Sequence, residues 1–208
     1  MASRRLGEKH LAWLKATLFA AALIPLGKLL VLGFTVGLGA NPIEKITRVT
    51  GYWTLSFLML TLTVTPLRLW TGRQWLGRLR RMLGLFAFFY VCLHFLAYLV
   101  LDQFFDWAGI VKDIAKRPYI TVGFACFLFM TPLAVTSTDA MLRRLGGRRW
   151  RALHRLVYPV AMGGVLHFVW LVKKDLTQPL QFAAVLAVLL GARVASAWAR
   201  RRGALTPS

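Results

Sequence analysis

Three histidines lie in strongly apolar stretches of this 208-residue chain, where an imidazole is costly to bury. His154 and His167 share one stretch, and His94 lies in another. Along a helix that rises about 1.5 Å per residue, His154 and His167 stand about 20 Å apart and therefore occupy two depths. Each ring could simply donate a hydrogen bond to a neighbouring carbonyl. Three of them in one chain, two of which lie at a matching depth, favour a functional site inside a membrane.

The composition indicates a membrane protein with several spans. Hydrophobic residues make up 58% of the sequence, and its mean hydropathy is +0.59. Several apolar runs approach the roughly twenty residues that cross a bilayer as a helix. We therefore predict an all-α, polytopic membrane helix bundle that forms a single domain over residues 1–208. The six expected transmembrane helices cover residues 11–38, 51–69, 82–101, 119–137, 153–172 and 179–198.

The formal net charge of +20 could indicate a nucleic-acid partner, but the positions of the charges argue against one. Of 27 Lys and Arg residues, 19 fall in the N-terminal tail, the second and fourth loops and the C-terminal end, whereas seven fall in the three opposite loops. Cytoplasmic loops carry the excess of Lys and Arg, so both termini are predicted to be cytoplasmic. The charge then sets topology first and contacts anionic membrane lipid second.

The depths of two histidines match on different predicted helices. His94 lies 13 residues after Arg81, and His167 lies 16 residues after Arg151. These separations correspond to about 20 Å and about 24 Å of helix, which places both rings at one level. Two neutral imidazoles facing each other can supply both axial ligands of a haem iron, whereas zinc would want four ligands with Cys or carboxylate among them. We therefore predict that His94 and His167 hold one haem.

His154 needs a different partner. Thirteen steps of a helix leave it roughly 140° around the axis from His167. The matching level of the third span holds Arg80 and Arg81 instead of a histidine. A second haem near the cytoplasmic face would thus combine His154 with an unknown sixth ligand or an open position. Arg80 and Arg81 could contact haem propionates or a quinone carbonyl, or could simply be cytoplasmic charge.

Small residues lie beside the predicted ligands. Gly163 and Gly164 are four and three residues before His167, and Ala97 is three residues after His94. At these spacings they share a helix face with the histidine, where they could let a macrocycle approach the backbone. Ordinary packing of small residues between membrane helices is the alternative.

These features resemble the ferric reductase-like transmembrane domain that is shared with NADPH oxidases. The resemblance rests on six spans, on histidines in the third and fifth, and on the H-x12-H pair His154/His167. The family typically carries a histidine pair on the third span, where only His94 matches here and Arg81 occupies roughly the other place. The stretch Arg-Arg-Met-Leu-Gly-Leu-Phe-Ala-Phe-Phe ahead of His94 resembles one branch, the haem-binding membrane subunits of periplasmic methionine sulfoxide reductase systems.

The resemblance implies an electron-transfer role in the bacterial inner membrane. It implies b-type haem, an associated FMN whose site the sequence does not identify, electrons from the quinol pool, and a periplasmic molybdopterin-dependent catalytic subunit that reduces methionine sulfoxide in oxidised proteins. The sequence contains no Gly-rich dinucleotide loop, so electrons are expected from outside the polypeptide. The chain would then be a relay without catalytic residues of its own, and its acceptor would dock on the loops near residues 102–117 and 173–178.

Two other classes of function fit the same residues. A six-span proton-coupled transporter or channel could use His94 and His167 as a proton relay, with Lys28 as a buried charge. Such a protein would lack a haem spectrum. A structural membrane partner without a cofactor would tolerate replacement of all three histidines.

Overall fold

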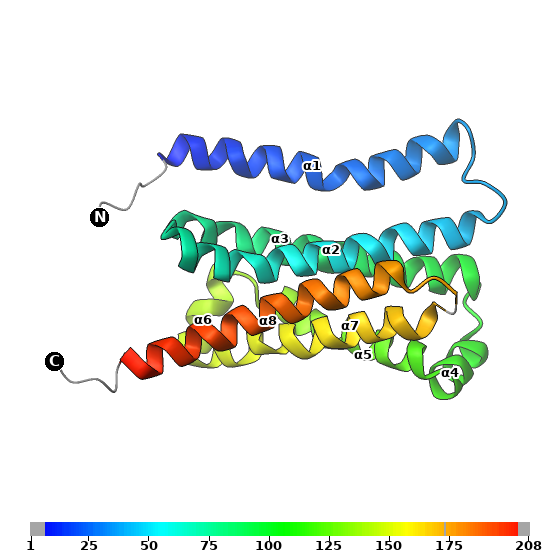
Figure 1. The fold of residues 1–208 in the computed structure, drawn as a ribbon. Helices are drawn as coiled ribbons and strands as arrows, with labels where there is room; N and C mark the ends of the chain where they lie inside the picture. Colours follow the sequence, from blue (N-terminus) through cyan, green and yellow to red (C-terminus); the bar gives the residue numbers. More distant parts are fainter. Residues whose placement is uncertain (1–6, 173, 204–208) are drawn as a thin grey trace.

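The computed structural model describes residues 7–172 and 174–203, and over these residues the chain is helical without a strand, as predicted. Figure 1 shows the long helices side by side, with α1 lying along the outside of the bundle. We call the end where α1 begins and α8 ends the terminal end, and the other the opposite end. The helices are α1 (Glu8–Phe34), α2 (Pro42–Thr71), α3 (Gly77–Leu96), α4 (Trp107–Lys116), α5 (Pro118–Val135), α6 (Asp139–Leu153), α7 (Val157–Leu171) and α8 (Thr177–Gly203).

Shorter helical turns join some of these helices. The 3-10 turn η1 (Gln74–Leu76) precedes α3, and the 3-10 turn η3 (His154–Leu156) joins α6 to α7. The π-helical turn η2 (Ala97–Asp102) extends α3 just beyond His94. Turns of the π type occur frequently at functional sites because they shift the side chains that follow them.

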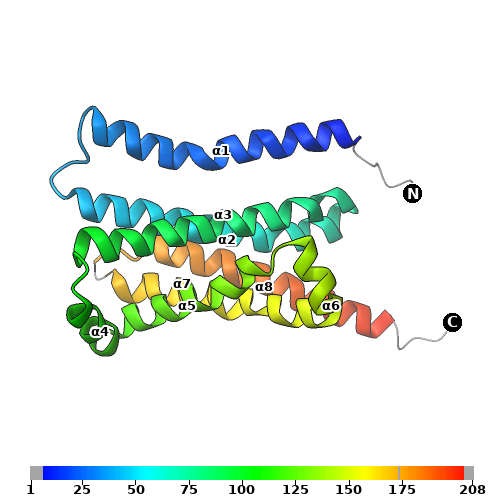
Figure 2. The same ribbon diagram turned by 180° about the vertical axis from the view of Figure 1, so that it is seen from behind.

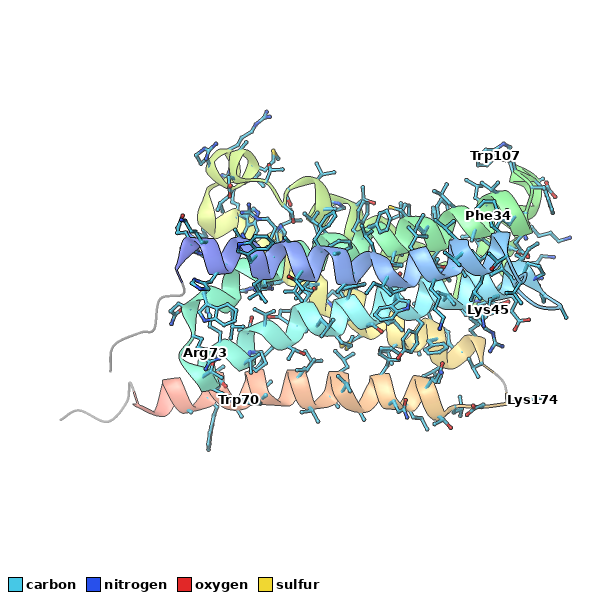
Figure 3. All side chains as sticks on the ribbon, turned by 90° about the horizontal axis from the view of Figure 1, so that it is seen from above. Phe34, Lys45, Trp70, Arg73, Trp107 and Lys174 are labelled. Atoms are coloured by element: carbon cyan, nitrogen blue, oxygen red, sulfur yellow. The ribbon has the colours of Figure 1, made fainter. Side chains whose placement is uncertain are left out.

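Five helical segments of the described chain are long and apolar enough to cross a membrane, by length and composition. They are Glu8–Phe34, Gln74–Asp102, Pro118–Val135, Asp139–Leu171 and Thr177–Ala199. Exposed tryptophans mark both ends of the bundle: Figure 3 shows Trp70 at one end and Trp107 at the other. Amphipathic indole rings are enriched at both interfaces of membrane proteins, so their placement fits helices that run from one interface to the other.

The predicted second span lies within α2, which is not among those five segments. Its middle is rich in threonine, which lowers its hydropathy. The hydroxyls are satisfied inside the helix, because Thr54 donates to the carbonyl of Thr50 at 2.9 Å and Thr61 donates to that of Phe57 at 2.7 Å. Leu58 and Leu62 of the same helix are buried in the core. Helix α2 therefore buries one side in the core, where its threonine hydroxyls need no partner outside the helix.

Several boundaries differ from the predicted spans because of local capping. The polar link expected over residues 41–50 is the first part of α2. The Asn41 side chain accepts a hydrogen bond from the Glu44 backbone N–H at 3.1 Å, and Pro42 occupies the first helical turn. Asparagine at the N-cap and proline just after it favour a helix start, so α2 begins well before the apolar run.

Two surface helices, α4 and α6, occupy segments that were expected to be loops between spans. Figure 2 shows α4 at the opposite end and α6 at the terminal end. The Asp106 side chain accepts from Gly109 N–H to cap α4, and the Thr138 hydroxyl accepts from Met141 N–H to cap α6. Both helices were missed because they are too short or too polar to be read as spans.

An aromatic layer ties α1, α2 and α3 together. Phe57 of α2 stacks with Phe86 and Tyr90 of α3, at centroid distances of 5.5 and 5.4 Å. Tyr90 is fully buried, and its hydroxyl donates to the carbonyl of Ala22 at 2.8 Å, three residues before Pro25 in α1. A proline inside a helix disrupts the local hydrogen-bond ladder, so this hydroxyl pairs a carbonyl at the kink.

Candidate functional site

The structure brings His94 of α3 and His167 of α7 together in the opposite half of the bundle. Their ring centroids are 6.2 Å apart and their ring planes are nearly perpendicular, at 87°. Among the described residues, no hydrogen bond joins the two rings. The predicted meeting of these two histidines at one level is therefore confirmed, and their role as ligands stays a prediction.

Backbone carbonyls orient both imidazoles. Nδ1 of His94 lies 3.0 Å from the carbonyl oxygen of Thr47 and 3.4 Å from the Thr50 hydroxyl. Nδ1 of His167 lies 2.6 Å from the carbonyl oxygen of Tyr119. Because a carbonyl can only accept, Nδ1 carries the hydrogen in each neutral ring, and Nε2 keeps its lone pair. This is the second-shell arrangement that orients a histidine for metal binding through Nε2.

Glycines of two other helices lie directly behind these rings. A Cβ atom at Gly51 of α2 would stand 3.0 Å from Cε1 of His94, and one at Gly123 of α5 would stand 2.8 Å from Nδ1 of His167. Any side chain at either position would displace the imidazole. Sequence reasoning missed both glycines, although each is an isolated glycine within an apolar span, and such glycines often mark close packing.

The glycines that precede His167 lie against neighbouring helices. A Cβ atom at Gly163 would lie 2.6 Å from Sγ of Cys126, and one at Gly164 would lie 3.0 Å from Leu55. These positions thus face protein atoms of α5 and α2. Of the two readings that the sequence left open, the structure favours ordinary helix packing over the approach of a macrocycle, because side chains of neighbouring helices fill the space beside these two glycines.

His154 lies apart from the other two rings, in η3 near the terminal end. Its Nε2 is 3.0 Å from the Thr136 hydroxyl oxygen, and its ring stacks on Trp150 at a centroid distance of 3.9 Å. Trp150 donates through Nε1 to the carbonyl of Thr136 at 2.8 Å. The Thr136 hydroxyl already donates to the carbonyl of Pro132, so it accepts from Nε2–H of His154. The lone pair of a neutral His154 is then on Nδ1.

A cavity of about 320 Å³ adjoins His154. Its lining includes the guanidinium groups of Arg68, Arg80 and Arg81 and apolar side chains such as Phe88. Arg81 forms a 2.7 Å ion pair with Asp139, whereas Arg80 has no hydrogen bond or ion pair with any described residue. The structure therefore places Arg80 and Arg81 beside His154, as expected, and away from His94 and His167.

Arg193 is an interior cation that sequence reasoning counted with the C-terminal charges. It lies in α8 within a segment that is apolar enough to span a membrane. Its Nη2 donates to the carbonyl of Leu62 at 2.6 Å, and its Nη1 donates to the Tyr158 hydroxyl at 2.9 Å. Pro66, four residues after Leu62, has no N–H to pair that carbonyl. Arg193 of α8 thus donates to the α2 carbonyl that Pro66 leaves without an N–H partner.

Known proteins match this sequence over most of the chain. A family model described as "Ferric reductase like transmembrane component" matches residues 49–165. A relative from Herminiimonas arsenicoxydans, named protein-methionine-sulfoxide reductase heme-binding subunit MsrQ, is 55% identical over 194 residues, which are 92% of this chain and 89% of the relative. The chain belongs to the MsrQ group of the ferric reductase-like transmembrane family.

Two further MsrQ relatives support the assignment. The protein from Ralstonia nicotianae is 55% identical over 203 residues, 96% of this chain and 94% of the relative. The protein from Rhodospirillum rubrum is 56% identical over 197 residues, 93% of each. The family match begins in α2 and includes His94, His154, Gly51 and Gly123. Together with its apolar helices, membership of a transmembrane family makes the chain a multi-pass membrane protein.

Proposed function

We propose that this chain is a b-type haem electron relay in which His94 and His167 hold one haem. The observation that carries the proposal is the pairing of their rings, 6.2 Å apart, with both Nδ1 atoms on backbone carbonyls. Imidazole nitrogens bind metal ions at about 2.0–2.1 Å, so two rings that share one ion have centroids roughly 6 Å apart. The separation and the free Nε2 atoms both fit two histidines that would hold one iron.

The surrounding residues explain how the pair is held for electron transfer. The carbonyls of Thr47 and Tyr119 hold each ring in one tautomer, and Gly51 and Gly123 leave each ring the space it occupies. A haem iron with two histidine ligands has no open coordination position and supplies one-electron transfer rather than oxygen activation. The protein therefore supplies positioning, and no residue of the chain is required to act as acid, base or nucleophile.

We propose the cavity beside His154 as the place of a second haem. Arg80 lies beside His154 without a carboxylate partner, and the guanidinium groups of Arg80 and Arg81 suit carboxylate or carbonyl groups because they present a fixed fork of donors. We therefore retain these arginines as contacts for haem propionates or for a quinone carbonyl. Binding of a metal through Nε2 would require His154 to leave Thr136, whereas binding through Nδ1 would not.

We further propose that the chain crosses the bacterial inner membrane six times, with both termini in the cytoplasm. Helix α2 supplies the span that composition alone does not show, since its 30 residues are longer than a bilayer requires and its core side is buried. The excess of Lys and Arg falls at the terminal end, which would face the cytoplasm. His154 then lies in the cytoplasmic half and the His94–His167 pair in the periplasmic half of a single domain over residues 1–208.

The names of the relatives support a methionine sulfoxide reductase as the partner, and family resemblance alone supports the donor and the chemistry of the acceptor. We propose electrons from the quinol pool and a periplasmic molybdopterin-dependent methionine sulfoxide reductase as acceptor, with FMN as a further cofactor by resemblance only. Helix α4 occupies the loop over residues 102–117 and offers an exposed Trp107 and Val111 to that partner. In the second proposed docking loop, residues 173–178, residue 173 lies outside the described residues.

An absorption spectrum of the purified protein tests the relay. Protein from haem-replete cells should show a Soret band and, after reduction by dithionite, the sharp bands of six-coordinate b-type haem. A colourless protein would contradict the proposal and favour the proton-coupled transporter, whose histidines need no cofactor.

A reconstitution with the partner tests the direction of electron transfer. In membranes that contain both proteins, quinol should reduce the haem, and methionine sulfoxide should reoxidise it only when the catalytic subunit is present. Reoxidation at the same rate without the partner would show that the chain is itself a terminal reductase.

A further inference from the structure

A second and larger cavity lies between α1 and α3 at the terminal end, with a volume of about 840 Å³. We call it the α1–α3 cavity. Within the described structure, α1 buries only Leu11, Ala22, Pro25 and Leu29 of its 27 residues. The helix therefore touches the bundle at a few points and leaves a space in its interface with α3.

The floor of the α1–α3 cavity is apolar. Phe19 and Leu23 of α1 face a row of apolar side chains on α3, namely Met82, Leu85, Phe86 and Phe89. Phe19 and Phe86 meet edge to face at 5.1 Å. Leu23 lies about 12 Å along α1 from Lys15, and Phe89 lies about 12 Å along α3 from Arg81, at about 1.5 Å per residue. The cavity thus extends from the charged end of the bundle toward its apolar middle.

The mouth of the cavity is cationic. Its basic side chains among the described residues are Lys15, Arg68, Arg78 and Arg81, and its one lining carboxylate is Asp139. Asp139 pairs with Arg81. Arg78 reaches Glu8 only at 3.7 Å, and the Glu8 side chain is 93% exposed, so this pair adds little. Lys15 and Arg68 have no ion pair with any described residue. The mouth therefore carries an excess of positive charge.

We propose that the α1–α3 cavity binds an anionic glycerophospholipid of the surrounding membrane. The phosphate lies among the basic side chains, and an acyl chain follows the apolar floor beside Phe19 and Phe86. Basic pockets between transmembrane helices recognise anionic headgroups in this way. A quinone has a neutral head and would leave the charges of Lys15, Arg68 and Arg78 unmatched, and a free phosphate compound would leave the apolar floor bare. The bound lipid completes the interface between α1 and α3.

Native mass spectrometry of the full chain in detergent tests the proposal. The probes are palmitoyl-oleoyl phosphatidylglycerol and palmitoyl-oleoyl phosphatidylcholine, which share acyl chains and differ in headgroup charge. Phosphatidylglycerol should bind the wild type at least about tenfold more tightly. Lys15→Gln/Arg78→Gln should remove most of this preference. Lys45→Gln/Arg48→Gln removes two charges from the opposite end and should keep it.

A steric variant covers the case in which the double variant folds poorly. Leu85 is 40% exposed and lines the cavity, so Leu85→Trp can fill part of the space without entering the core. It should weaken phosphatidylglycerol binding severalfold while circular dichroism shows wild-type helicity. Equal binding of the two lipids, an equal loss in the Lys45/Arg48 variant, or displacement of phosphatidylglycerol by ubiquinone or FMN at equal concentration would each overturn the proposal.

Discussion

His94 and His167 are oriented by backbone carbonyls, whereas His154 is oriented by a hydroxyl and an indole ring. A carbonyl in a helix cannot rotate and can only accept, so it imposes one tautomer and presents Nε2. The Thr136 hydroxyl donates to the carbonyl of Pro132, so a change of tautomer at His154 would cost that hydrogen bond. The comparison teaches that backbone atoms fix two rings against each other around His94 and His167, whereas side chains position a single ring beside a cavity at His154.

The atoms that surround the histidines also differ between the two regions. The backbones of α2 and α5 lie directly behind His94 and His167 at Gly51 and Gly123. His154 instead adjoins an open cavity lined by Arg80 and Arg81. Close packing therefore defines the first region, and charge and space define the second.

The largest effect is expected from replacing the histidines, and it should differ between the two regions. His94→Ala and His167→Ala should each remove most of the haem in the opposite half, because one remaining imidazole cannot fill both axial positions. His154→Ala should leave that haem and affect only haem at the terminal end. Haem content and reduced spectra of the purified variants provide the measurement. An equal loss in all three variants would mean that the histidines are paired differently.

The second-largest effect is expected from replacing the glycines behind the rings. Gly123→Ala and Gly51→Ala should push His167 and His94 out of position, which lowers haem content and costs about 1–3 kcal/mol of stability by overpacking. Gly27→Ala of α1 is the matched control, since a Cβ there meets nothing within 4 Å and alanine is the better helix former. Haem spectra and denaturant unfolding in detergent would reveal the difference. Wild-type spectra for both ring-side variants would contradict the role assigned to these glycines.

Replacing Arg193 should affect stability more than either haem. Arg193→Leu leaves the carbonyl of Leu62 unpaired beside Pro66, which costs about 1–3 kcal/mol. Unfolding in detergent measures this loss. The haem held by His94 and His167 should be retained in the folded fraction, because Arg193 lies away from that pair. Selective loss of that haem at unchanged stability would instead connect Arg193 to the opposite half.

The smallest effect is expected at Thr136. Thr136→Val removes the hydroxyl that accepts from His154 and should cost about 1 kcal/mol. The change should shift only the spectrum or midpoint potential of haem at the terminal end, with the other haem as an internal reference. A shift in both haems would show that the two regions are coupled.

The sequence allowed much of the fold to be predicted because helix length and hydropathy are local properties. Most spans were placed within a few residues of α1, α3, α5, α7 and α8. The start of α2 was misplaced because capping by Asn41 and Pro42 extends a helix beyond its apolar run. Helices α4 and α6 were missed because short surface helices depend on caps and on packing against neighbours.

The candidate site was predictable in part for the same reason. The rise of a helix is constant, so the depths of His94 and His167 could be compared by counting residues from flanking arginines. Gly51, Gly123 and Arg193 could not be assigned a role in this way, because their contacts join residues far apart in the chain. For Gly163 and Gly164 the sequence left two readings open, because helix periodicity shows the face of a residue but not what lies opposite.

By itself, the sequence therefore determined the helical membrane character, the approximate spans and the shared level of two histidines, all of which follow from local composition and a regular rise per residue. Only the tertiary structure decided which imidazole nitrogen is free, which glycines lie behind the rings, and how Arg193 is paired inside α8. The physical reason is that hydrogen-bond partners and close contacts between helices depend on rotation and packing, which a single helix does not encode.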